Sequence, residues 1–92
     1  MPAGASTASI TVTVRFFAAA RSAAGRTDEA IVVPGPATVG DVLAALVAAH
    51  GSRLADVLRR CSYLLGETAV HGIPTPVIDG DTLDVLPPFA GG

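Results

Sequence analysis

The stretch ITVTVRFF, residues 10–17, decides the fold. Its apolar residues alternate with threonines, an arginine and Phe17, and this period of two in β-branched residues predicts a half-buried strand. Residues 29–33 predict a second strand, which Pro34-Gly35-Pro36 closes. The two strands are therefore expected to form a hairpin, with a loop or a short helical turn over the small residues 18–25.

A helix is predicted over residues 38–50. Thr38 is followed three residues later by Asp41, which resembles a capping box with Asp in place of the usual Glu or Gln. The apolar residues behind it fall on one face at helical spacing, and Gly51 supplies a C-terminal stop. Ser52 is expected to cap a shorter helix that extends to Leu58.

The second half of the chain predicts strands separated by turns and a loop. They span residues 61–65, 69–71 and 82–86. Asp79-Gly80-Asp81 marks a tight turn before the last of them. On that last strand Leu83 and Val85 share one face, and the other face is shared by Thr82, Asp84 and Leu86.

The order of elements is β-β-α-β-(β)-β, with one main helix available to cover one face of a mixed sheet. This order is typical of the β-grasp (ubiquitin-like) architecture, an α+β fold. Its first and last strands are expected to be parallel neighbours at the centre of the sheet. We predict one β-grasp domain over residues 10–86, preceded by a disordered extension, residues 1–9, and followed by a flexible tail, residues 87–92.

The composition excludes several classes of protein. Ninety-two residues, half of them hydrophobic, suffice for one small domain with its own core. The net charge is −2 and the six basic residues are scattered arginines, so no nucleic-acid partner is expected. No apolar stretch is long enough for a membrane span, and residues 1–9 do not resemble a signal peptide. The single cysteine, Cys61, suits a reducing cytoplasm and is interpreted as a buried structural thiol.

Conventional catalytic groups are missing from the sequence. His50 and His71 lie far apart, at a predicted helix end and in a turn, where surface or capping roles are expected. The turn that Asp79 and Asp81 form explains their presence. The serines lack a G-x-S-x-G setting, and there is no glycine-rich phosphate loop. We therefore expect no catalysis by the chain alone, no metal and no bound cofactor.

The chain ends in PPFAGG, residues 87–92, which points to chemistry at the terminus itself. The prolines stiffen the neck, and a Gly-Gly tip without Cβ atoms can enter a narrow channel. The terminal carboxylate of Gly92, with an ordinary pKa of about 3.3–3.7, is ionised at neutral pH and is a poor electrophile. Adenylation by ATP on a partner enzyme would convert it into an acyl donor. The alternative is an ordinary frayed end, but this tail directly follows a predicted core strand.

Four segments in this order resemble the MoaD family, the small subunits of molybdopterin synthase. They are RFFAAAR (15–21) with Gly25, TVGDVL (38–43), DGD (79–81) and PPFAGG (87–92). The resemblance implies a ubiquitin-like sulfur carrier in which a MoeB-like enzyme of the ubiquitin-activating type adenylates Gly92, with Gly91 beside it, using ATP. A sulfur donor would then convert Gly92 to a thiocarboxylate. The tail would enter a MoaE-like large subunit and give its sulfur to cyclic pyranopterin monophosphate.

The resemblance also implies an apolar surface that binds both partners. We assign to it Phe17, Leu86, Pro87, Pro88, Phe89 and Ala90. The alternative is that these side chains cover the edge of a small core. The sequence departs from the family near Gly66, where an Asn is often found, and in its N-terminal extension.

Three other functions remain open from the sequence. Carriers for cysteine synthesis end similarly in Ala-Gly-Gly, whereas carriers for thiamine-thiazole synthesis usually lack the Phe16-Phe17 strand and end in a different glycine run. A ubiquitin-like modifier would be conjugated through Gly92 to lysines of target proteins. An inert binding domain would not need Gly91 and Gly92 at all.

Overall fold

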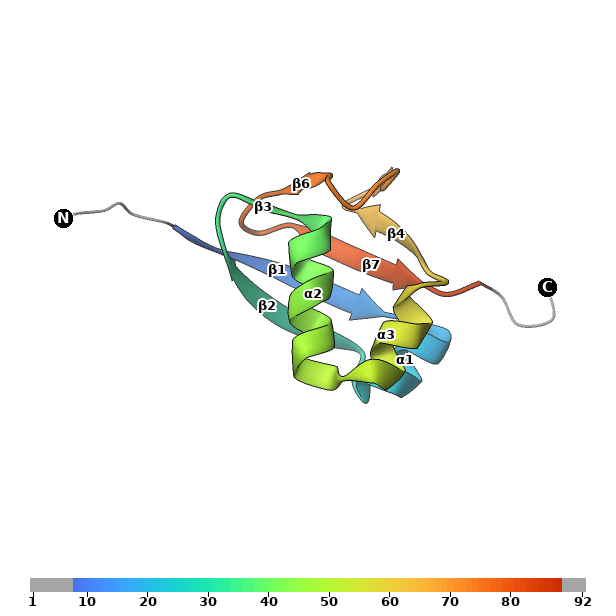
Figure 1. Ribbon diagram of the computed structural model, residues 1–92. Helices are drawn as coiled ribbons and strands as arrows, with labels where there is room; N and C mark the ends of the chain where they lie inside the picture. The colour runs from blue at the N-terminus through green and yellow to red at the C-terminus, as the bar shows by residue number, and fades with distance from the viewer. Residues whose placement is uncertain (1–7, 89–92) are drawn as a thin grey trace.

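A mixed sheet with helices on one face forms the body of the protein (Figure 1). The computed structural model describes residues 8–88. The helices are Ala18–Ala24 (α1), Val39–His50 (α2) and Ser52–Leu58 (α3). The strands are Ser9–Phe16 (β1), Asp28–Pro34 (β2), Ala37–Thr38 (β3), Ser62–Leu65 (β4), Thr68–Ala69 (β5), Pro76–Val77 (β6) and Thr82–Leu86 (β7).

The first and last long strands lie side by side at the centre of the sheet. The main sheet has the order β2-β1-β7-β4-β5, and β1 pairs with β7 in parallel, with Val14 opposite Leu83. Strands β2 and β4 flank this pair in antiparallel orientation. The predicted β-grasp fold and its central parallel pair are therefore confirmed.

The alternation in residues 10–17 places one side of β1 in the core. Val12, Val14 and Phe16 are buried under the helices, and Leu83 and Val85 are buried beside them on β7. The helical side of this core contains Val39, Val42, Leu46, Leu54 and Leu58. Burial of side chains of this size contributes about 1.5–3 kcal/mol each, so this layer holds the helices on the sheet.

Helix α2 begins with the predicted capping box. The backbone N–H of Thr38 donates to Asp41 Oδ2 over 2.8 Å, and the N–H of Asp41 donates to Thr38 Oγ1 over 3.3 Å. The helix ends at Gly51, whose φ of 91° only glycine adopts easily. Ser52, however, is not the cap of α3, because Gly51 occupies that position and no side chain caps the helix.

Three elements differ from the sequence prediction. The stretch between β1 and β2 forms α1, the helical one of the two predicted alternatives, so the hairpin is interrupted by two turns of helix. The return strand β5 is shorter and one residue earlier than expected. Within the expected loop, Pro76–Val77 forms β6, which pairs with β3 in a separate two-stranded sheet.

Two residues of the predicted N-terminal extension, Ala8 and Ser9, lie among the described residues. Ser9, expected in the extension, is the first residue of β1, and Ala8 O accepts a hydrogen bond from Gly35 N over 2.8 Å. At the other end, Pro87 and Pro88 follow β7 directly. The remainder of the predicted extension and tail, residues 1–7 and 89–92, lies outside the described residues.

Candidate functional site at the base of the tail

The C-terminal tail leaves the body from a strand that is hydrogen-bonded on both sides. β7 lies between β1 and β4, with Val85 opposite both Phe16 and Tyr63. Leu86, the last residue of β7, pairs with Ser62 of β4. The segment that precedes the prolines therefore has a fixed position and direction relative to the whole sheet.

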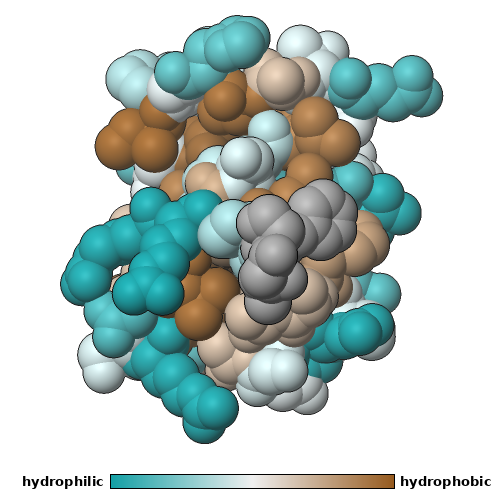
Figure 2. Space-filling model, turned by 90° about the vertical axis from the view of Figure 1, so that its right-hand side faces the viewer, coloured by the Kyte–Doolittle hydropathy of each residue, from teal (hydrophilic) through white to brown (hydrophobic). Residues whose placement is uncertain are grey.

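An apolar hollow of about 660 Å³ lies at this base. It is lined by Phe17, Ala18, Ala19, Arg60, Ser62, Leu86, Pro87 and Pro88. Figure 2 shows the end of the molecule from which the chain leaves β7: apolar residues lie above and below the residues drawn in grey, and the most hydrophilic residues lie mainly toward the edges of this face. The structure thus brings together four predicted interface residues: Phe17, Leu86, Pro87 and Pro88.

Phe17 reaches the hollow because the chain turns sharply after β1. β1 ends at Phe16, and Phe17 is extended, with φ −125° and ψ 150°, at the start of α1. Ala18 then has a positive φ of 50°, which is unusual for a residue with a Cβ. Since Phe16 is buried, this turn leaves Phe17 outside the core, with 37% of its surface exposed. Phe17 belongs to the turn rather than to the strand, but its predicted outward position is confirmed.

An ion pair supports the outer face of the sheet behind Phe17. Arg15 Nε and Nη2 donate to the two carboxylate oxygens of Asp84 over 2.6 and 2.8 Å, across the parallel strands β1 and β7. The hydrogen bonds to Asp84 and its negative charge raise the pKa of Arg15 above its usual value. The guanidinium carbon of Arg15 also lies 5.8 Å from the centre of the Phe17 ring, within range of a cation–π contact.

Asp84 shares the face of β7 that the alternation predicts, yet it is buried there. It does lie on the outer face with Leu86, but only 9% of its side chain is exposed because Arg15 covers it. The Arg15 side chain is 52% exposed, so the pair presents the cation to solvent and conceals the anion. A partner that approaches this face would therefore meet a positive group beside Phe17.

The two predicted turn carboxylates serve the backbone. Asp79 Oδ1 accepts from Thr11 N over 2.7 Å, and Asp81 Oδ2 accepts from Ile78 N over 2.8 Å. Gly80 between them has a φ of 89°. The interpretation of this pair as turn-forming is confirmed, and no group of three or more potential metal ligands occurs within residues 8–88.

The two histidines differ, and one departs from the prediction. His71 is exposed, as expected. His50 is instead largely buried at the end of α2, with Nε2 2.6 Å from Glu29 Oε1 of β2 and both side chains 16% exposed. The His50 ring also meets Phe16 edge-on at 6.3 Å. This histidine is a packing residue between helix and sheet, which its position at a helix end did not reveal.

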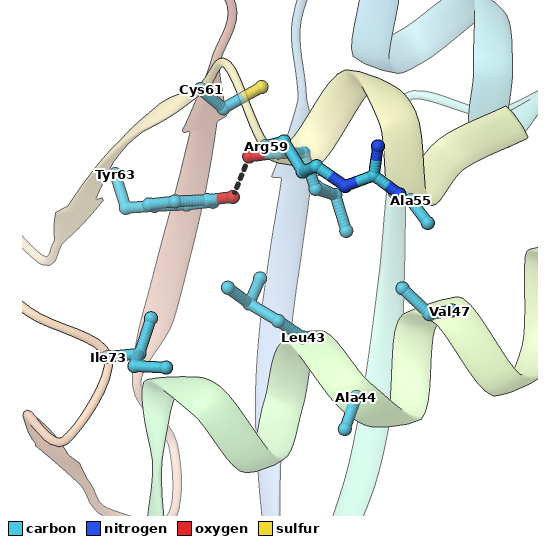
Figure 3. A pocket seen from close by; sticks show the side chains of 9 residues that line it. Leu43, Ala44, Val47, Ala55, Arg59, Cys61, Tyr63 and Ile73 are labelled. Carbon is cyan, nitrogen blue, oxygen red and sulfur yellow. Dashed lines mark hydrogen bonds between the residues drawn. The ribbon is translucent and has the colours of Figure 1, made fainter. Parts of the chain in front are cut away.

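Cys61 lies beside a second, smaller hollow between α2 and the α3–β4 connection, of about 370 Å³ (Figure 3). Its thiol is partly buried and lies 3.2 Å from the carbonyl of Val57, and burial raises its pKa, which disfavours the nucleophilic thiolate. Tyr63 donates its hydroxyl to Leu58 O over 2.7 Å, which the dashed line in Figure 3 marks. These contacts support a structural role for Cys61.

Sequence reasoning missed Ala18, Ala19, Arg60 and Ser62 in the lining of the tail-base hollow. Ser62 could have been found, since outward positions on β4 must neighbour Leu86 once the strand order is known. No local pattern marks the two alanines or Arg60. The predicted tail residues Phe89, Ala90, Gly91 and Gly92 lie outside the described residues. No helix in residues 8–88 is long and apolar enough to cross a membrane.

The fold, and the hollow from which the tail departs, define a ubiquitin-like carrier or modifier protein. The chain belongs to the ThiS family, whose model matches residues 14–92. It is 30% identical to the molybdopterin synthase sulfur carrier subunit of Chlamydomonas reinhardtii, over 88% of this chain and 98% of that protein. It is 39% identical to small archaeal modifier protein 3 of Haloferax volcanii, over 86% and 96% of the two chains.

Solved structures of ubiquitin-like proteins also resemble this chain. The crystal structure of SAMP1 from Haloferax volcanii matches with a TM-score of 0.79 and 30% identity, over 89% of this chain and 99% of that one. A chain from the complex of subunits 1 and 2 of the molybdopterin-converting factor of Helicobacter pylori matches with a TM-score of 0.64 and 26% identity, over 90% of this chain and 100% of that one. A chain of the BexX/CysO complex of Amycolatopsis orientalis matches with a TM-score of 0.68 and 27% identity, over 88% of this chain and 99% of that one. The predicted kinship with MoaD-like sulfur carriers is confirmed, whereas these relatives belong to more than one pathway.

Proposed function

We propose that the protein is the sulfur-carrier small subunit of a molybdopterin synthase. The observation that carries this proposal is the apolar hollow formed by Phe17, Leu86, Pro87 and Pro88 where the tail leaves the central strand β7. A surface placed there can dock on a partner while the last residues enter that partner's active site. The Chlamydomonas relative carries the corresponding name, and the Helicobacter structure contains two subunits of the same factor.

The chemistry follows from the terminal carboxylate. Its attack on the α-phosphate of ATP, in an adenylating enzyme, releases pyrophosphate and leaves an acyl-adenylate at Gly92. A sulfur nucleophile then displaces AMP and leaves a thiocarboxylate. In the large subunit this sulfur is transferred to cyclic pyranopterin monophosphate, and water restores the carboxylate. The chain itself supplies the carrier group and the docking surface, and its partners supply catalysis.

The first test is intact-mass analysis after incubation with a candidate adenylating enzyme, ATP and a sulfide source. We expect the mass gain of one sulfur replacing one oxygen, and none when a residue is added after Gly92, because the carboxylate no longer reaches the α-phosphate. Transfer is then measured by adding a MoaE-like subunit and the cyclic pterin. Formation of the thiocarboxylate without any molybdopterin would refute the proposed pathway.

The docking surface has its own test. We expect Leu86→Asp and Phe17→Asp to weaken binding to the large subunit by about tenfold or more, since apolar anchors at interfaces are typically worth ~2 kcal/mol or more. The matched control is Ile78→Asp, which adds the same charge at an apolar residue that is 68% exposed and precedes β7 at its other end. Equal affinities of the Leu86 and Ile78 variants would place the interface elsewhere.

A protein modifier is the second candidate, favoured by the 39% identity to small archaeal modifier protein 3. In that case the adenylated Gly92 would be attacked by a lysine ε-amine of a target protein, which forms an isopeptide bond and releases AMP. Cell extracts would then contain a ladder of larger adducts that disappears when Gly91 and Gly92 are removed. A carrier would instead be recovered as free protein and its thiocarboxylate. This chain has no lysine, so it cannot form chains on itself through lysine side chains.

A further inference from the structure

The outer strand β2 has one side without a partner. Among residues 8–88, β2 is the terminal strand of the main sheet and pairs with β1 alone. Phe16 N donates to Thr27 O over 2.8 Å, and this register directs the backbone groups of every second residue, including Ile31, toward β1. The N–H and C=O groups of Ala30 and Val32 therefore face outward. Within residues 8–88, these four groups form no hydrogen bond.

The middle of this edge, residues 30–33, carries neither a charge nor a proline, although the strand begins with Asp28 and Glu29. Exposed edges are commonly shortened, charged or interrupted by proline. The opposite edge of the sheet follows that rule, since β5 contains only Thr68 and Ala69. β2 has seven residues, and its proline, Pro34, is the last of them. At its middle, Val32 is apolar and 62% exposed.

A groove runs beside this edge on the helical side of the sheet. It has a volume of about 510 Å³ and is lined by Val32, Val33, Pro34, Gly35, Pro36, Asp41 and Ala45. Its floor lies between β2 and the first half of α2. An added strand would direct alternate side chains toward this groove and the others to the outer face of the sheet.

The charge of the groove indicates which side chains an added strand should carry. Among the residues that the structure describes, Asp41 is the only charged one that lines the groove. Its Oδ2 atom caps α2, and its other carboxylate oxygen accepts no hydrogen bond from the described residues. At the far end of β2, the exposed Asp28 lies opposite Arg15 of β1, whose positive charge offsets it. A basic side chain of an added strand is therefore expected at the Asp41 end.

We propose that the β2 edge binds an extended segment of a partner protein as a sixth strand, with an aliphatic side chain in the groove and a lysine or arginine beside Asp41. The N–H and C=O groups of Ala30 and Val32 offer four main-chain hydrogen bonds for this purpose. Within the described part of the chain, the groove and the hollow at the tail base have no lining residue in common. The segment therefore binds independently of the C-terminal chemistry, and a partner can be held while the tail is in use.

The test uses the full-length protein and the synthetic peptide acetyl-KTVTVTVR-amide, followed by two-dimensional amide NMR. We expect shifts centred on Ala30 and Val32, and slower hydrogen exchange of these two amides. Val32→Pro removes one edge N–H and should weaken binding by about tenfold, or ~1.4 kcal/mol. Val32→Thr keeps the N–H and the branched shape, and should bind as the parent does. Removal of Gly92 should change nothing, which separates this proposal from the carrier function.

A second measurement leaves the protein unaltered. Methylation of the peptide nitrogens on alternate residues gives two peptides, of which only one loses the donors that face β2. We expect one peptide to lose binding and the other to retain it. Equal binding of both, shifts at Leu86 instead of Val32, or the absence of any shift would overturn the proposal. So would a β2-mediated dimer of the protein that the peptide does not dissociate.

Discussion

Replacement of His50 by alanine tests how α2 is held to the sheet. The His50→Ala variant lacks the 2.6 Å hydrogen bond to Glu29 and the edge-on contact with Phe16. A hydrogen bond with a charged partner is worth about 1.5–3 kcal/mol, and an aromatic contact about 0.5–1.5 kcal/mol. Because water can partly replace the imidazole as a hydrogen-bond partner of Glu29, we expect the free energy of unfolding to fall by about 2 kcal/mol. For a domain of this size that lowers Tm by about 8–16 °C.

The assay is urea and thermal unfolding at neutral pH, followed by circular dichroism. His50→Gln keeps a side-chain donor for Glu29 but removes the ring, so it should lose about half as much as His50→Ala. The matched control is His71→Ala, in an exposed loop, for which we expect less than about 0.5 kcal/mol. If the two alanine variants are equally stable, His50 is not the packing residue described above.

Two further predictions concern local contacts. Burial raises the pKa of Tyr63 to about 12 and also raises that of Cys61. The folded state therefore holds both protons more tightly than the unfolded chain does. Stability should fall as pH rises above about 9, where the thiol ionises in the unfolded chain, and fall further between about 10 and 12 because of Tyr63. The chain has no lysine that would titrate in the same pH range. The stability of Tyr63→Phe should therefore depend less steeply on pH above about 10, and the difference from the parent measures the contribution of the tyrosine. At neutral pH the variant should be about 1 kcal/mol less stable, because it lacks the hydrogen bond to Leu58 O. Thr38→Ala breaks the capping box with Asp41 and should lose about 1 kcal/mol in urea unfolding, whereas an unchanged midpoint would remove the cap from the account of α2.

The long elements were predictable because their periodicity reports burial directly. Alternation marked β1, and Thr38, Asp41 and Gly51 marked both ends of α2. The two-residue pair β3–β6 was not predictable, because a strand of that length has no period and Pro76 argues against one. For α1, whose sequence AAARSAA is mostly alanine, a loop and a short helical turn were both expected, because these residues show no apolar periodicity.

The site was predictable only where side chains stand out along the chain. Phe17 and Leu86 are apolar at outward positions, and the structure places both on one hollow. The cover that Arg15 provides for Asp84 depends on the parallel register of β1 and β7, which pairs residues 69 positions apart. The unpaired side of β2 likewise follows from strand order, which no local pattern contains.

The central position of β7 also determines how the protein responds to force. The chain enters β1 and leaves β7 at opposite ends of two parallel neighbours (Figure 1). A pull between the two ends therefore loads the β1–β7 ladder lengthwise, and its hydrogen bonds must rupture together instead of opening one after another. An unfolding motor that grips the tail would work against this shear, so the body should resist extraction more strongly than its small size suggests.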